Sequence, residues 1–491
     1  MQMTVVVTGF FVALGLAGVC AAQVPAGPDF RVNSYTTGHQ YDPRLAVESD
    51  GDFLVTWTSL GIDGSGLGAV GQRFDAAGAP RGGEFVLNAY TTGDQAFPAP
   101  AVHRSGAFVV AWQDDRGIQA RHFDKLGHPI GAEFQVDTYT TGLQYRVNVA
   151  RSEYTEFVVT WVSEGADGSG FGIAAQPFLT SFEPSGPELV VNSYTTGHQS
   201  NPHVAAERFS GDFVVVWNDQ GRDGSGTGIF GRRFTAAGNP VGADFQVNTY
   251  TTGDQWRPSV SVAPGGRFVV AWASPGLDGD SVGVVARRFE ADGVPLGSEF
   301  VVNSYTTSLQ SVIPDAVSHD LHGNFVILWD GSAPGSLFGQ RIFGQRFDAD
   351  GSRRGLEFAV NSYTTGFLSG GVVRSDAIGN IVATWQDVSG ADGDRSGAFA
   401  RRFGGLFPRS LRVDTPGNGV IEAGEIVDVR PTWSNTTDSA QVFSGTFAWT
   451  SGPGGPQPTA LDGSGDYGTV PAAAAVECAD CYSVSFPAAP R

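Results

Sequence analysis

The twelve residues 414–425, DTPGNGVIEAGE, combine acidic side chains with glycine in a pattern typical of a calcium-binding loop. Such loops hold calcium through oxygens at fixed positions and need a glycine at position six for a sharp turn. The first, fifth, ninth and twelfth positions are Asp414, Asn418, Glu422 and Glu425, and the sixth is glycine. The carbonyl of Val420 is the expected backbone ligand. We therefore expect one calcium ion in this loop.

Two features weigh against this calcium site. Pro416 stands where a third ligand would be, and strands rather than helices are expected on both sides of the loop, so the EF-hand itself is absent. The alternative interpretation is an acidic turn that joins two strands. Three carboxylates within twelve residues would repel one another without a cation, which favours the metal.

A second acidic pattern, DGSG, recurs at 63–66, 167–170 and 223–226, with variants that begin at Asp278 and Asp392. Each loop offers one carboxylate and one hydroxyl, whereas a cation needs several oxygens. The structural interpretation is that each Asp caps a turn and each Gly takes a positive φ angle. The functional alternative is a set of equivalent shallow binding sites. Two loops depart from the pattern, QDDRG at 113–117 and DGSAPGSLFG at 330–339, and such departures are where a single specific site would evolve.

Seven of the twelve tyrosines occupy the same place in a repeated YTT segment: Tyr35, Tyr90, Tyr139, Tyr194, Tyr250, Tyr305 and Tyr363. One interpretation is a ring of stacking platforms for a ligand. The other is a wedge between neighbouring repeat units, because a structural joint must recur in every unit. A glutamine follows the segment in six units, from Gln40 to Gln310, and is expected to bond nearby backbone.

Motifs for catalysis are weak. GDSVG at 279–283 matches a hydrolase nucleophile pattern centred on Ser281, but that pattern needs a strand, a sharp turn and a helix, and here a strand follows. The eight histidines lack metal-protease spacing, and no Gly-rich phosphate loop is present. We therefore expect no catalytic residues. Cys478 and Cys481, in CADC, are expected to form a local disulfide in an oxidising compartment.

The elements that position these residues are repeated. Close copies of VNSYTTGHQ begin at Val32, Leu87, Val136, Val191, Val247, Val302 and Val360, about 55 residues apart. Each unit contains four short apolar runs, and the second run ends in a tryptophan: Trp57, Trp112, Trp161, Trp217, Trp272, Trp329 and Trp385. No unit offers a helix-length amphipathic pattern. The sequence therefore predicts an all-β fold, a seven-bladed β-propeller of four-stranded antiparallel blades.

The strand count predicts how the ring closes. Residues 29–33 form a fourth strand with no preceding three, while the last unit ends at Phe403 without a fourth. The N-terminal strand is therefore expected to complete the last blade and remove an open edge. Strand alternation places the YTT segments and the post-Trp loops on one face, here called the loop face, and the Asp-Gly hairpins on the opposite hairpin face. By analogy with propellers in general, which most often bind ligands at this face, we expect the ligand at the loop face.

The motifs VNxYTTGxQ, FVVxW, DGSGxGI and GxRFDxxG resemble those of a family of bacterial secreted repeat proteins. The resemblance covers roughly residues 30–403. It implies a propeller fold and export, and it names no reaction. After Gly404 the pattern ends, and residues 405–491 are interpreted as a small immunoglobulin-like β-sandwich domain. Its span of about 80 residues is short for a fold of about 100, so an incomplete domain is the alternative.

Composition and the N-terminus indicate the compartment. Residues 1–22 form an apolar run that ends in small residues, which predicts a signal peptide cleaved after Ala22 and a propeller domain over residues 23–404. No other segment approaches the roughly 20 apolar residues of a membrane span, so no stable membrane insertion is expected after cleavage. The formal charge of −20 argues against nucleic acid as a partner. We expect a secreted or cell-surface monomer.

These observations favour a secreted, non-catalytic binding or adhesion module that uses the loop face to bind an extracellular protein or glycan. The alternatives are an extracellular polysaccharide hydrolase or lyase, and a structural spacer of a surface protein. Asymmetry separates the first two classes, because catalysis needs one unique polar cluster whereas multivalent binding tolerates repeats.

Overall fold

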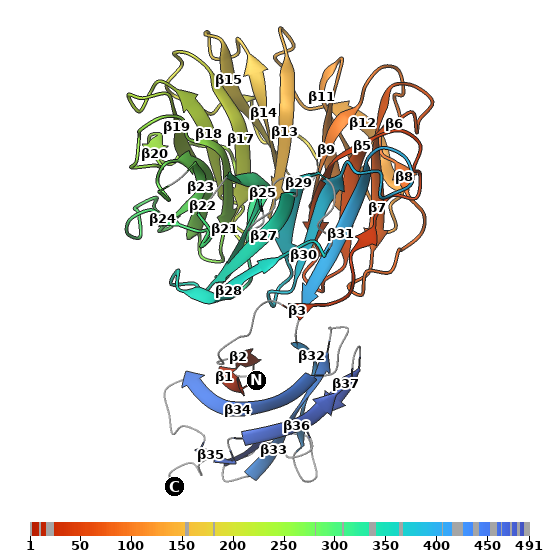
Figure 1. Cartoon of the computed structure of the whole chain (residues 1–491), viewed down its shortest axis with the longest axis vertical. Helices are drawn as coiled ribbons and strands as arrows, with labels where there is room; N and C mark the ends of the chain where they lie inside the picture. The colour runs from red at the N-terminus through yellow and green to blue at the C-terminus, as the bar shows by residue number, and fades with distance from the viewer. Residues whose placement is uncertain are drawn as a thin grey trace. The chain divides into compact units, whose positions relative to one another are not determined.

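The computed structural model describes residues 2–8, 11–15, 24–152, 157–179, 182–279, 281–306, 309–332, 340–362, 367–404, 406–414, 426–435, 441–451, 459–462, 464–471, 474–478 and 482–485. Every regular element in these ranges is a β-strand (Figure 1). No helix long and apolar enough to cross a membrane occurs among them. The chain forms two compact units, Pro28–Arg402 and Met1–Gly27 with Phe403–Arg491.

The larger unit is the predicted seven-bladed propeller. Blade 1 contains β5 (Gln40–Val47), β6 (Phe53–Leu60), β7 (Leu67–Phe74) and β8 (Phe85–Val86). Blade 2 contains β9 (Ala96–Val102), β10 (Phe108–Asp114), β11 (Gly117–Phe123) and β12 (Pro129–Gln135). Blade 3 contains β13 (Gln144–Arg151), β14 (Phe157–Glu164), β15 (Phe171–Phe178) and β16 (Leu189–Val190). In each blade the strands pair antiparallel in sequence order.

The remaining blades repeat this plan. Blade 4 contains β17 (Gln199–Ala206), β18 (Phe213–Gln220), β19 (Thr227–Phe234) and β20 (Phe245–Gln246). Blade 5 contains β21 (Trp256–Val262), β22 (Phe268–Pro275), β23 (Val282–Phe289) and β24 (Phe300–Val301). Blade 6 contains β25 (Gln310–His319), β26 (Phe325–Ser332), β27 (Gln340–Phe347) and β28 (Arg353–Ala359). Blade 7 contains β29 (Leu368–Ser375), β30 (Ile381–Asp387) and β31 (Gly397–Gly404), and β4 (Phe30–Arg31) is its fourth strand.

The core lies between adjacent blades. The seven tryptophans of the second strands are 0–1% exposed. Within one blade, a phenylalanine that starts the second strand stacks on the phenylalanine that ends the third, as Phe53 does on Phe74 with ring centroids 4.9 Å apart. Each second strand is covered on both faces by neighbouring blades, which explains its continuous run of apolar residues.

The N-terminal strand closes the ring as predicted. Phe30 pairs with Ala400 in β31, and the Val32 amide donates to the Ala398 carbonyl at 2.8 Å. Val32 is 5% exposed and packs in the cluster between blades 7 and 1. A short preceding strand, β3 (Val24–Pro25), also pairs with β31. The last blade therefore has no free outer edge along β4.

An acidic clasp fastens each blade to the next. A carboxylate directly before or within each fourth strand accepts hydrogen bonds from the segment that enters its blade, mostly from the backbone amide of the residue before tyrosine. The seven clasps are Glu84 to Ser34, Glu133 to Ala89, Glu188 to Thr138, Asp244 to Ser193, Glu299 to Thr249, Glu357 to Ser304 and Asp29 to Ser362. The last one joins the two ends of the ring.

The smaller unit contains two sheets. One has β32 (Leu406–Asp414), β33 (Ile426–Asn435), β38 (Tyr482–Ser485) and β35 (Thr459–Asp462), with β37 (Ala475–Glu477) paired to β33. The other has β2 (Phe11–Gly15), β1 (Gln2–Thr8), β34 (Gln441–Ser451) and β36 (Ser464–Val470). Cleavage after Ala22, which remains a prediction, would remove β1 and β2. The immunoglobulin-like assignment also remains a prediction.

Candidate functional site

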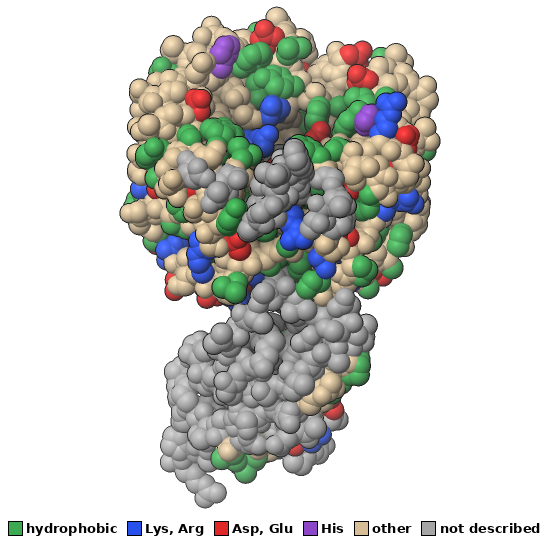
Figure 2. Space-filling view, viewed as in Figure 1, with side chains coloured by type: hydrophobic (Ala, Val, Ile, Leu, Met, Phe, Trp, Pro, Cys, Tyr) green, Lys and Arg blue, Asp and Glu red, His purple; other side chains and the backbone are tan. Residues whose placement is uncertain are grey.

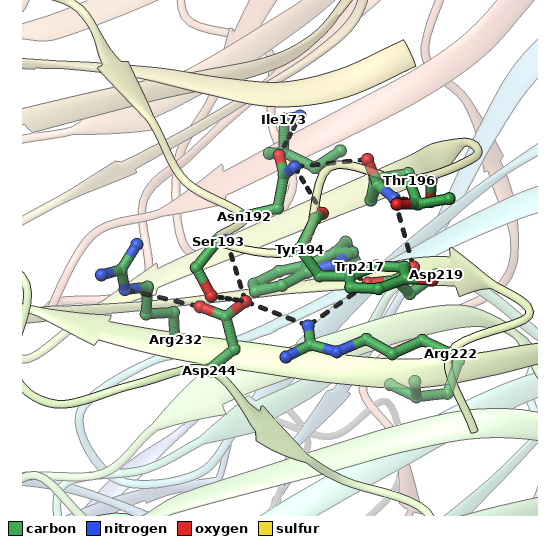
Figure 3. Close-up of polar contacts among 12 residues, drawn as sticks. Ile173, Asn192, Ser193, Tyr194, Thr196, Trp217, Asp219, Arg222, Arg232 and Asp244 are labelled. Atoms are coloured by element: carbon green, nitrogen blue, oxygen red, sulfur yellow. Dashed lines mark hydrogen bonds and ion pairs between the residues drawn. The ribbon is translucent and has the colours of Figure 1, made fainter. Parts of the chain in front are cut away.

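The repeated VNSYTTGHQ segment is a self-contained hydrogen-bonded loop. In the copy between blades 3 and 4, the Asn192 side chain accepts from the Ile173 amide at 2.8 Å and donates to the Tyr194 carbonyl at 3.0 Å. Gln199 accepts from Asn192 and donates to the Thr196 carbonyl at 3.1 Å (Figure 3). These bonds satisfy the loop's buried polar groups, so the asparagine and glutamine of the repeat have structural roles.

The DGSG loops belong to the same network. Asp63 Oδ1 accepts the Ser65 amide at 3.2 Å, and its Oδ2 accepts from Asn88 at 2.8 Å. The same pair of bonds recurs at Asp167 and Asp223. Because both oxygens of each carboxylate accept a hydrogen bond within the protein, the geometry favours the turn-capping interpretation.

The tyrosines pack against the following blade. The six that the structure describes are half-buried. A Cβ added to Gly165, which has a φ of +80°, would lie 3.0 Å from the Tyr139 hydroxyl, so this glycine admits the ring. Tyr363 lies outside the described residues. This packing favours the wedge interpretation, and the ligand role of the tyrosines remains a prediction.

The unusual loop of blade 2 is held by ion pairs. Arg116 donates to Asp114 Oδ2 at 2.5 Å and to Glu133 Oε1 at 2.9 Å, and its guanidinium lies 4.0 Å over the Tyr90 ring. Blade 4 uses Arg222 in the same way, between Asp219 and the clasp residue Asp244 (Figure 3). The departure at 113–117 is therefore a structural ion pair. The departure in blade 6 falls largely on 333–339, outside the described residues.

A buried carboxylate that sequence reasoning missed joins four blades across the central channel. Asp315, from β25, is 3% exposed. Its Oδ2 is 2.6 Å from Arg44 of β5, and its Oδ1 is 2.7 Å from Arg374 of β29 and 2.5 Å from His203 Nε2 of β17. The Val260 amide donates to His203 Nδ1 at 3.2 Å, so Nε2 carries the hydrogen that is donated to Asp315.

The charges around Asp315 decide its state. Burial alone would raise its pKa, but Arg374, His203 and Arg44 together hold the pKa of Asp315 well below the usual 3.8. The carboxylate is therefore ionised at neutral pH. Both of its oxygens accept hydrogen bonds from charged or polar side chains within the protein. We call this group, Asp315 with Arg44, His203 and Arg374, the channel cluster.

The inner strands place a second set of side chains at the loop-face mouth of the channel. Each carries a β-bulge near its start, where one residue has a positive φ: Asp42 at 46°, Phe97 at 58°, Arg146 at 58°, Asn201 at 51° and Arg257 at 54°. Gly370 and Asp315 have this conformation in blades 7 and 6. We call the first five residues the bulge ring. Bulges re-aim side chains at the rims of closed sheets.

Bonds between blades hold the bulge ring. The Thr58 hydroxyl accepts the Phe97 amide at 2.8 Å, and Gln113 Oε1 accepts the Arg146 amide at 2.9 Å. Arg146 also bonds Asn201 of the next blade. Partial burial lowers the pKa of Arg146, and the neighbouring charges of Arg257 and Arg44 lower it further. Figure 2 shows basic side chains in the central hollow between the blades.

One channel carboxyl has a pKa closer to neutral pH than an ordinary aspartate. Burial raises the pKa of Asp330, which follows the tryptophan of β26, to about 6. Its buried Oδ1 has no hydrogen-bond partner among the described residues. Burial also raises the pKa of Asp42. By contrast, Ser281 lies in an exposed turn directly before β23, so the hydrolase nucleophile context is absent there.

The predicted metal and disulfide residues are only partly described. Asp414 ends β32, whereas Asn418, Val420, Glu422 and Glu425 lie outside the described residues. Within the ranges given above, no group of three or more His, Cys, Asp or Glu side chains could hold a metal. Cys478 is disulfide-bonded, and Cys481 lies outside the described residues.

We propose that the loop 414–425 binds one calcium ion. Calcium several-fold above its Kd should stabilise the folded chain by roughly 1 to 2 kcal/mol. Calorimetry on the full chain, with calcium or a chelator, measures this, and Asp414→Ala should abolish the effect. If calcium produces neither heat of binding nor a higher melting temperature in the unsubstituted chain, the acidic-turn interpretation holds.

Comparisons with known proteins concern the fold. No family model matches the chain and no curated protein does, so the resemblance to the bacterial repeat family rests on its motifs. A protein of unknown function from Dyadobacter fermentans is 12% identical with a TM-score of 0.45, over 78% of this chain and 98% of that one. The α-L-arabinanase of Penicillium chrysogenum is 16% identical with a TM-score of 0.37, over 77% and 97%. The propeller domain of the Trilobed protease from Pyrococcus furiosus is 9% identical with a TM-score of 0.42, over 75% and 94%.

Proposed function

We propose that the protein is a secreted, non-catalytic binding or adhesion module that takes an extracellular protein or glycan at the centre of its loop face. The bulge ring is the observation that carries this proposal. The surrounding segment repeats closely from blade to blade, yet the residue two positions after the glutamine is Asp, Phe, Arg, Asn and Arg in blades 1 to 5. Blades that are otherwise alike thus place different side chains around the loop-face mouth of the central channel.

The conformation of these residues strengthens the proposal. A positive φ at a non-glycine residue costs of order 1 kcal/mol or more, and it is a clear outlier for a bulky side chain such as Phe97. Phe97 and Arg257 are exposed, so the strained backbone there is not compensated by burial of the side chain. A recognition surface with two arginines, an aromatic ring and two short polar groups suits one ligand per propeller, since the ring has no internal repeat.

The channel cluster supports a non-catalytic role, because its ionised carboxylate is held between two arginines and a histidine inside the protein. The alternative, a polysaccharide hydrolase or lyase, is favoured by Asp330. A carboxyl with a pKa of about 6 is suited to donate a proton to a leaving group. Its partner would have to be a second carboxylate at the same mouth, and Asp42 is the residue that the ring offers.

A glycan and protein array, run beside a hydrolase substrate panel, tests the proposal. Arg146→Ala and Arg257→Ala should each weaken ligand binding at least tenfold, because truncating a central arginine commonly costs about 2 kcal/mol or more. The matched control is Arg267→Ala, which removes an exposed arginine paired with Glu290 at the start of β22 and should leave binding unchanged.

The other outcomes separate the alternatives. Turnover that Asp330→Asn abolishes would establish the hydrolase and end the binding proposal. If Arg146→Ala and Arg257→Ala both bind the ligand as the unsubstituted chain does, the ligand site does not lie at the bulge ring. If the protein shows neither binding nor turnover, the structural-spacer alternative is supported.

A further inference from the structure

The hairpin-face half of the central channel is hollow. Two adjoining cavities of about 160 and 180 Å³ lie where the inner strands β5, β9, β13, β17 and β29 end. The inner one reaches His203 and Arg374, which both bond Asp315. The channel cluster therefore forms the floor of a pocket that opens at the hairpin face.

Arg151, the last residue of β13, lines both cavities. Its Nε is buried without a hydrogen-bond partner, and no ion pair compensates its charge among the described residues. Burial lowers the pKa of Arg151 to about 10, so the guanidinium is still charged at neutral pH. A largely buried charge without a partner is strongly unfavourable, and folded proteins normally pair it.

The rest of the lining is also basic. Arg104 and Arg208 contribute two more guanidinium groups, and Arg208 is oriented by donating to the Ser49 hydroxyl at 2.7 Å. Among the described residues of this lining, the one carboxyl belongs to Glu48. Burial, with Asp50 and Asp52 nearby, raises the pKa of Glu48 to about 7, so it is about half protonated at neutral pH. The chain has a net charge of −20, whereas the described residues of this lining carry three arginines and one half-protonated acid.

We propose that this pocket binds a small oxyanion, such as phosphate, sulfate or a carboxylate, with Arg151 as its principal ligand. The anion supplies the charge that Arg151 lacks, and Arg104 and Arg208 close around it from neighbouring blades. Guanidinium groups present paired N–H donors that match two oxygens of one anion. A cavity of about 160 Å³ exceeds the roughly 30 Å³ share of one water several-fold, so a tetrahedral or planar oxyanion fits.

The proposal is independent of the loop-face ligand, since the two sites lie on opposite sides of the channel cluster. Its test is isothermal titration and thermal melting of the full chain with inorganic phosphate, sulfate or acetate, at constant ionic strength with chloride as the reference. We expect saturable binding of at least one of the three, with a rise in melting temperature. Which anion binds best distinguishes a tetrahedral dianion from a carboxylate.

Arg151→Gln provides a sharp discrimination. It should weaken anion binding at least tenfold and, because it removes an unpaired buried charge, should leave the melting temperature without anion unchanged or raise it. Arg267→Gln, an exposed arginine of the same charge, is the matched control for non-specific effects and should bind as the unsubstituted chain does. Absence of saturable binding for all three anions would overturn the proposal. A lower anion-free melting temperature in Arg151→Gln would also overturn it, because Arg151 would then have a partner within the protein.

Discussion

Replacing Asp315 by alanine is expected to lower the free energy of unfolding of the propeller by about 3 to 5 kcal/mol. The substitution leaves Arg44 and Arg374 as buried or half-buried charges without their counter-ion, and His203 loses its acceptor. For a unit of this size the loss corresponds to a fall of roughly 5 °C in melting temperature. Calorimetry measures both quantities.

Asp320→Ala is the matched control for Asp315→Ala. Asp320 lies in the same blade and is 5% exposed, but its carboxylate caps the turn at 320–324 by accepting the His322 and Asn324 amides. Its loss should cost about 1 kcal/mol. The double variant Asp315→Ala with Arg374→Ala should be less destabilised than the sum of the singles, since the two charges are coupled. If Asp315→Ala melts at the same temperature as Asp320→Ala, the channel cluster does not make the expected contribution to stability.

Acid titration gives a second measurement on the same carboxylate. The folded pKa of Asp315 lies well below the unfolded value near 3.8. Its stabilising contribution is therefore fully present above about pH 4 and is lost as the pH falls through the folded pKa. Asp315→Asn should lack this acid-dependent contribution, so its stability should fall less steeply than that of the unsubstituted chain below pH 4.

The fold was predictable because its determinants repeat. Each blade has a tryptophan in the second strand and a VN-YTT segment after the fourth, and these determine strand number, order and face. The local bonds of the segment span at most nine residues, as from Asn192 to Gln199, so a single copy contains them all. The acid of the fourth strand was visible too, but its partner lies about 50 residues earlier, in the segment that enters the same blade.

The channel cluster could not be predicted. Asp315 meets Arg44, His203 and Arg374 across sequence separations of 271, 112 and 59 residues, and none of the four residue types recurs at the equivalent position of another blade. The bulge ring has a signature in the sequence, namely variation at one position of the repeat. The residue two positions after the repeated glutamine differs between blades, as Asp42, Phe97 and Arg146 show, while its neighbours repeat. Variation at one position of a repeat indicates a residue that the repeated structure does not require.

Blade 2 shows how the repeat adapts where one member changes. Its post-Trp loop lacks the DGSG aspartate, and the asparagine that would donate to that aspartate is replaced by Asp137. Asp137 Oδ1 still accepts the Ile118 amide at 2.6 Å, as asparagine does elsewhere. An aspartate at both positions would place two carboxylates in contact, so the two changes belong together.

Deleting residues 23–34 should abolish the single cooperative unfolding of the propeller and cause aggregation. The deletion removes Phe30, which packs against Phe53 and Phe74 at ring-centroid distances of 6.5 and 5.6 Å, and the buried Val32. It also removes the Asp29 clasp on Ser362 and the pairing along β31. One buried and one half-buried side chain, with about six hydrogen bonds, amount to on the order of 10 kcal/mol, which is comparable with the whole stability of a typical domain.

The exposed outer edge of β31 explains the expected aggregation, because unpaired strand edges pair with other chains. Deleting residues 23–27 is the matched control: it removes β3 but keeps Asp29 and β4, so cooperative melting should persist. Asp29→Asn isolates the clasp, and loss of its charge should cost about 1 to 2 kcal/mol without loss of cooperativity. Light scattering and calorimetry on the three proteins measure these effects. A 23–34 deletion that melts as one monomeric transition at the unsubstituted temperature would show that the ring does not depend on its N-terminal strand.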